Sequence, residues 1–74
     1  MAIKAFIELE SVGWGISTET AMVYPMLAVG GYDYDNGEFI LDLTNNEEWM
    51  ASLSKQDKET VELFARVFHS KFWV

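Results

Sequence analysis

The most restrictive feature of this sequence is an apolar stripe near its C-terminal end. It repeats at three- and four-residue steps, the spacing of one helix face, and consists of Val61, Phe64, Ala65, Phe68 and Phe72, widened by Leu63 and Val67. Ser54, followed three residues later by Asp57, matches the pattern of a helix N-terminal cap. We therefore expect a long helix from about Lys55 to Lys71.

The first 43 residues predict strands. In "IKAFIELE" the apolar residues Ile3, Ala5, Ile7 and Leu9 occupy alternate positions, which is the period of a half-buried strand. A helix through the same residues would place Phe6 and Glu10 on one stripe and leave Leu9 out of it. The strand is therefore the preferred interpretation.

A second strand pair is predicted after this segment. Gly13 and Gly15 indicate a bend, because glycine inside a strand pattern usually marks one. A hairpin that turns over residues 18–21 would bring Ile16 opposite Val23. Pro25 has no amide hydrogen for a ladder, so this arm is either an edge strand or ends near the proline.

The stretch Gly30 to Leu43, "GGYDYDNGEFILDL", has two interpretations. An EF-hand calcium loop needs glycine at position six and glutamate at position twelve. Counted from Asp33, the sequence places Gly37 at position five and Thr44 at position twelve. The stretch therefore does not match a calcium loop of this type.

The other interpretation is a β-hairpin. Asn36–Gly37 is a favoured pair for a two-residue type I′ turn. The hairpin would place Tyr34 opposite Phe39 and would leave acidic side chains at its tip. A plain turn is preferred over a weak divalent cation site there.

A short helix is predicted between this hairpin and the long helix. Thr44 and Glu47 have the spacing of a capping box, so the helix is expected over about 45–53. The predicted fold class is α+β, in one domain of residues 1–74. A small antiparallel sheet of hairpins or a meander, about residues 2–43, would pack against the C-terminal helix, about 55–71.

Charge is unevenly distributed along the chain. The formal net charge is −7, and every charged residue from Ala5 to Ser54 is acidic. The last twenty residues hold four basic residues, Lys55, Lys58, Arg66 and Lys71. Direct nucleic-acid binding is disfavoured, because phosphate contacts require lysine and arginine. An acidic face suits a basic protein surface, although an acidic bias also favours solubility.

Composition bounds the remaining possibilities. The chain has no cysteine, which excludes disulfides and thiolate metal sites. It shows neither a signal peptide nor an apolar run of about 20 residues, so we expect a soluble cytoplasmic protein without membrane contact. A core of this size supplies little stability, and a homodimer is therefore expected.

These features favour a non-enzymatic interaction protein that binds another protein through acidic and aromatic surface. The candidate surface combines acids around the predicted turn with aromatic types common at interfaces, and consists of Asp33, Asp35, Glu38, Asp42, Tyr24 and Trp73. Trp73 is the hardest to bury in a monomer, because chain ends fray. Either the helix end docks on the sheet or a second chain covers it.

Two alternatives stay open. One is an acid–base or metal-assisted enzyme that uses carboxylates near Asn36–Gly37, and the other is a structural subunit of a larger assembly. His69 is the only histidine, and no glycine motif for phosphate binding is present. No catalytic residue, metal ligand or cofactor is therefore assigned.

The strings "VYPML", followed by a glycine pair, and "EEWMASLSKQDKE" resemble small acidic proteins of marine tailed phages related to cyanophages. The resemblance covers about Tyr24 to Glu59. It implies a viral source and therefore the cytoplasm of a bacterial host. That group has no assigned activity, so no functional residue is carried over.

Overall fold

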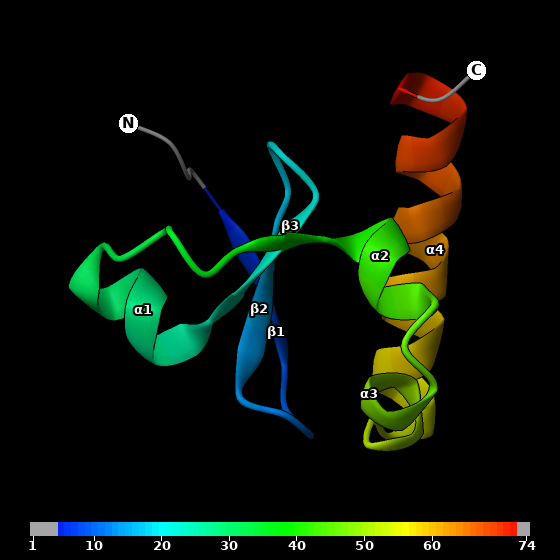
Figure 1. Ribbon diagram of the computed structural model, residues 1–74, viewed down its shortest axis with the longest axis horizontal. Helices are drawn as coiled ribbons and strands as arrows, with labels where there is room; N and C mark the ends of the chain where they lie inside the picture. Colours follow the sequence, from blue (N-terminus) through cyan, green and yellow to red (C-terminus); the bar gives the residue numbers. More distant parts are fainter. Residues whose placement is uncertain (1–4, 73–74) are drawn as a thin grey trace.

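The computed structural model describes residues 5–72, with side chains for residues 5–68. A four-stranded antiparallel sheet runs in chain order through β1 (Phe6–Leu9), β2 (Trp14–Ser17), β3 (Met22–Pro25) and β4 (Glu38–Phe39). The helices are α1 (Met26–Gly31), α2 (Ile40–Thr44), α3 (Glu47–Ala51) and α4 (Lys55–Phe72). Helix α1 lies on one side of the strands and α2, α3 and α4 lie on the other (Figure 1). The predicted α+β fold is confirmed.

The central hairpin has the predicted register. Ile16 of β2 pairs with Val23 of β3. The turn between them is held by the Ser17 hydroxyl, which accepts hydrogen bonds from the backbone N–H groups of Glu19 and Thr20, both at 3.3 Å. Strand β3 ends at Pro25, which is the N-cap of α1. A proline fits both roles because neither requires its missing amide hydrogen.

The predicted hairpin at Asn36–Gly37 is wrong. Strand β4 pairs with β3 instead, with Met22 opposite Phe39 and Val23 opposite Glu38. The residues that follow form α2, because Ile40 and Leu43 lie three residues apart and are both buried. This segment fits the period of a strand and the period of a helix, and packing against α4 selects the helix.

The main core lies between the sheet and helices α2, α3 and α4. Its fully buried residues come from both layers, and the largest are Leu9, Ile16, Val23, Ile40 and Val61. Burial of each such side chain contributes about 1.5–3 kcal/mol. Val61 and Ala65 are the buried members of the stripe predicted for α4, and Phe64 and Phe68 pack against this core.

The opposite face of the sheet is covered by α1 and the loop that follows it. The ring of Phe6 meets the ring of Tyr24 edge to face at 6.0 Å. A side chain at Gly15 would collide with Phe6 and Met26, so the close approach of α1 to the sheet requires glycine there. Phe6 is consequently half-buried, while Ile7, predicted on the covered face, remains 38% exposed.

Of the two predicted helix caps, the one at Ser54 is confirmed and the one at Thr44 is wrong. The predicted Thr44–Glu47 capping box is wrong, because Thr44 is the last residue of α2 and its hydroxyl donates to the carbonyl of Leu41 at 2.8 Å. Asn46 caps α3 instead and accepts from the N–H of Trp49 at 3.1 Å. Ser54 caps α4 as expected, accepting from the N–H of Asp57 at 3.2 Å. Among the helices of the described residues, none has the length and apolar content needed to cross a membrane.

Candidate interaction surface

The structure separates the six residues predicted to form an interaction surface. Asp33, Asp35 and Glu38 are exposed and lie in the segment that joins α1 to β4 and in β4 itself. Asp42 is also exposed, but it belongs to α2 in the other helical layer (Figure 1). Trp73 lies outside the described residues.

Tyr24 is not part of this surface, since only 6% of it is exposed. Its ring contacts Tyr34 edge to face at 5.4 Å and also lies against Gly37. We call residues 33–38 the acidic segment. Because the Tyr24 ring packs against Tyr34 and Gly37, it supports this segment from below. A partner of the folded protein does not reach it.

The acidic segment forms one wall of a cleft of about 420 Å³. We call it the Trp14 cleft, and its lining residues are Trp14, Pro25, Asp35, Asn36, Gly37 and Glu38. Trp14 and Pro25 are opposite one another at the ends of β2 and β3. The pairing of β4 with β3 places Glu38 in the same wall, because Glu38 is opposite Val23.

Local hydrogen bonds shape the acidic wall of this cleft. The carboxylate of Asp33 accepts the backbone N–H of Asp35 at 3.2 Å, and the N–H of Gly37 donates to the carbonyl of Tyr34 at 3.4 Å. Aspartate favours such turns because its side chain bonds to the backbone two residues on. Asp35 is exposed and lines the cleft.

Two of the residues that line the Trp14 cleft, Asp35 and Glu38, are acidic. Within residues 5–68, no carboxylate forms an ion pair with Lys55, Lys58 or Arg66. A cleft lined by a tryptophan and two acidic residues is a favourable environment for a lysine or arginine side chain, because such a side chain can stack on an aromatic ring and pair with a carboxylate.

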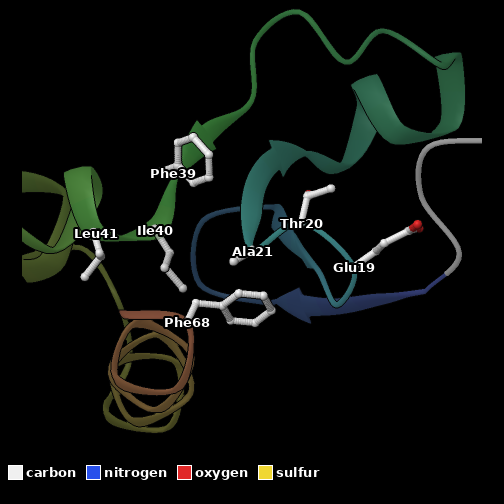
Figure 2. A pocket seen from close by; sticks show the side chains of 7 residues that line it. All are labelled: Glu19, Thr20, Ala21, Phe39, Ile40, Leu41 and Phe68. Atoms are coloured by element: carbon white, nitrogen blue, oxygen red, sulfur yellow. The ribbon is translucent and has the colours of Figure 1, made fainter. Parts of the chain in front are cut away.

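A second cleft, of about 470 Å³, is apolar. It lies between the β2–β3 turn, the start of α2 and the C-terminal half of α4, and its lining residues are Glu19, Thr20, Ala21, Phe39, Ile40, Leu41 and Phe68. Figure 2 shows the side chain of Glu19 directed away from Ile40 and Phe68. The cleft therefore offers apolar contacts but no convergent polar groups of the kind that orient a substrate.

One acid, Asp57, is largely buried, and its role is structural. It accepts hydrogen bonds from the backbone N–H of Ser11, at 2.9 Å, and from the Ser11 hydroxyl. The Ser11 oxygen in turn accepts the N–H of Ser54 at 3.0 Å. The hydrogen bond from the Ser11 side chain holds the pKa of Asp57 below its ordinary value of 3.8, while burial opposes this shift. A carboxylate kept ionised and occupied in this way is poorly suited to acid–base catalysis near neutral pH.

The described residues do not bring three or more histidine, cysteine, aspartate or glutamate side chains together into a metal-binding group. The enzyme alternative requires carboxylates near Asn36–Gly37 to converge, among them Asp33, Asp35 and Asp42. Asp33 and Asp35 are exposed in the segment before β4, whereas Asp42 is exposed on α2 in the other helical layer. The geometry of this segment therefore suits binding better than it suits a reaction.

The sequence places Asn36 and Gly37 beside the acids, but it does not indicate that Trp14 and Pro25 line the same cleft. The pairing of β4 with β3, and of β3 with β2, brings Trp14 and Pro25 to the acidic residues, and no local pattern signals a contact between segments this far apart. Comparisons with protein-family models, curated proteins and solved structures gave no match.

Proposed function

We propose that this protein is a non-enzymatic interaction protein that binds a basic segment of another protein through the Trp14 cleft. The observation that carries the proposal is the presence of Trp14, Asp35 and Glu38 in one cleft. Lysine and arginine are the side chains whose charge and shape suit a cleft that contains both an aromatic ring and acidic residues.

The charge of the whole chain supports the same partner. A net charge of −7 attracts a basic surface over several ångströms and accelerates association at low ionic strength. The same field repels nucleic acid. Binding should therefore weaken as salt screens it, since the Debye length falls from about 30 Å at 0.01 M to about 8 Å at 0.15 M salt.

The test uses a capped peptide in which arginine and lysine are separated by glycine, so that the peptide is basic without favouring a strand. Its dissociation constant is measured by calorimetry for the wild type and for D35N/E38Q. Exposed ion pairs contribute about 0.2–1 kcal/mol each, so the loss of two should weaken binding by roughly two- to thirtyfold.

The matched control is E47Q/E48Q, which removes the same charge from exposed positions on α3. E47Q/E48Q should retain most of the affinity for the peptide.

A third variant tests the aromatic ring. Trp14→Leu keeps an apolar wall and removes the aromatic face, and should reduce the binding free energy of the peptide by about 0.5–1 kcal/mol. Equal weakening by the two double variants would show that only net charge matters, and the proposed role of the cleft would be abandoned.

Three further expectations remain predictions: the viral source indicated by the sequence resemblance, the homodimer, and the role of structural subunit. If the source is viral, the basic partner is a protein of the host. Size-exclusion chromatography at several protein concentrations distinguishes a monomer from the expected homodimer.

A further inference from the structure

Among the described strands, β1 forms one edge of the sheet and pairs only with β2. An edge strand presents a row of backbone N–H and C=O groups to which another extended chain can bind. The other edge, β4, has only two residues and continues directly into α2. Of the two edges, β1 is therefore the one long enough to add a strand.

The register identifies the backbone groups that face outward. The N–H of Thr18 donates to the carbonyl of Ala5 at 3.2 Å, and Phe6 is opposite Ser17. Because hydrogen-bonded and non-hydrogen-bonded pairs alternate in an antiparallel ladder, Ala5, Ile7 and Leu9 bond to β2. The backbone groups of Phe6 and Glu8 therefore point to the open edge.

Within the described residues, β1 contains neither a proline nor a bulge that would block strand addition. Natural edges are blocked by proline, by bulges or by an inward-pointing charge, and β1 has the unbroken sequence Phe-Ile-Glu-Leu. Ile7 is 38% exposed on the core side of the sheet, and Glu8 is exposed on the other side. The edge thus offers an apolar position and an acidic position on opposite faces.

We propose that β1 binds an extended segment of a partner protein in which basic and apolar residues alternate. Side chains directly opposite one another in a sheet lie on the same face. A lysine or arginine beside Glu8 would meet an opposite charge, and an apolar side chain beside Ile7 would cover its exposed surface. A second copy of this chain is disfavoured as the occupant, because each copy carries a net charge of −7.

This surface differs from the Trp14 cleft, and the two proposals do not depend on each other. The cleft would bind single cationic side chains, whereas the edge of β1 would bind the backbone of a strand. D35N/E38Q should therefore weaken binding of the glycine-spaced peptide and leave binding at β1 largely intact.

The probe is a short capped peptide of alternating lysine and valine, titrated into the full chain and followed by NMR of the backbone amides. The amide signals of Phe6 and Glu8 should shift, and their exchange with solvent deuterium should slow as the peptide saturates the edge. The control peptide has the same composition with all lysines at one end. As a strand it cannot place its lysines on the Glu8 face and its valines on the Ile7 face, so it should bind more weakly.

Two variants at one position separate the backbone contribution from the charge. Glu8→Pro removes an outward N–H without removing a hydrogen bond to β2, and should weaken peptide binding about tenfold, because one strand carbonyl loses its donor. Glu8→Gln keeps that N–H and removes the charge. This variant should bind the peptide more tightly than Glu8→Pro does, and its affinity should depend less on salt than that of the wild type. If Glu8→Pro fails to fold, the exchange data on the wild type decide.

Three results would overturn the proposal. One is equal binding of the alternating and the block peptide. Another is a set of shifts confined to the Trp14 cleft, with Phe6 and Glu8 unchanged. The third is protection of Phe6 and Glu8 that appears without peptide as protein concentration rises, which would assign the edge to a second copy of this chain.

Discussion

Glycine is required at position 37 by the packing of the Tyr24 ring and not by the backbone angles of Gly37 itself. A type I′ turn would have required a positive φ at Gly37, but among the described glycines only Gly13 has one, at 64°. A side chain at position 37 would occupy the space of the Tyr24 ring. Glycine is needed here because the ring packs directly against the backbone of the acidic segment.

We expect Gly37→Ala to destabilise the protein by about 1–3 kcal/mol, because either the Tyr24 ring or the acidic segment must move. The measurement is the free energy of unfolding in denaturant. Gly30→Ala is the matched control, since a side chain there meets no atom within 4 Å, and alanine should add about 0.5–1 kcal/mol of helix stability. Equal stability of the two variants would contradict the packing of Tyr24 on Gly37.

Among the secondary-structure elements, the bond between Ser11 and Asp57 links parts that are far apart in sequence. The two residues are 46 positions apart, and they join the β1–β2 turn to the first turn of α4. Ser54 caps the helix while its own N–H donates to Ser11. One group of hydrogen bonds therefore starts α4 and attaches it to the sheet.

This arrangement predicts how stability depends on pH. The pKa of Asp57 is lower in the folded than in the unfolded protein because of its Ser11 hydrogen bonds. Its contribution should therefore be complete above the ordinary value of 3.8 and should decline as pH falls from 3.8 through the folded pKa.

Asp57→Asn, compared with the wild type by denaturant unfolding at several pH values, tests this dependence. The variant should lose about 1–3 kcal/mol at neutral pH, and the difference from the wild type should shrink below pH 3.8. Glu59→Gln, at an exposed position of α4, should stay within about 0.5 kcal/mol of the wild type. A difference independent of pH would contradict the role given to the Asp57 charge.

At the scale of the whole molecule, the fold is three layers with a net charge of −7 (Figure 1). Helices cover both faces of a small sheet, which explains why apolar residues in β1 do not follow a simple alternation of buried and exposed. The charge is not neutralised by ion pairs among the described lysine and arginine side chains. The compact state therefore carries a cost of like-charge repulsion.

Screening this repulsion should stabilise the fold. Raising sodium chloride from about 0.01 M to about 0.15 M shortens the Debye length from about 30 Å to about 8 Å, and the midpoint of thermal unfolding should rise. D35N/E38Q should show a smaller rise, because it has already lost two negative charges. A midpoint that falls with salt would indicate that attractive ion pairs outweigh the repulsion.

The sequence by itself determined those parts of the molecule whose signals are local and repeated. Helix α4 follows from the regular apolar spacing that begins at Val61 and from the Ser54 cap, and the pairing of Ile16 with Val23 follows from a short turn between two strands. In each case the residues that decide the structure lie within a few positions of one another, so a periodic pattern is sufficient to predict it.

Only the tertiary structure decided the partner of β4, the helical form of residues 40–44 and the membership of the Trp14 cleft. Each of these segments is short and fits more than one local structure, so the choice depends on long-range burial. Packing of Ile40 and Leu43 against α4, and of Tyr34 on Tyr24, selects one arrangement. The candidate acids Asp35 and Glu38 were visible in the sequence, whereas Trp14 joins them because β4 pairs with a strand more than ten residues earlier.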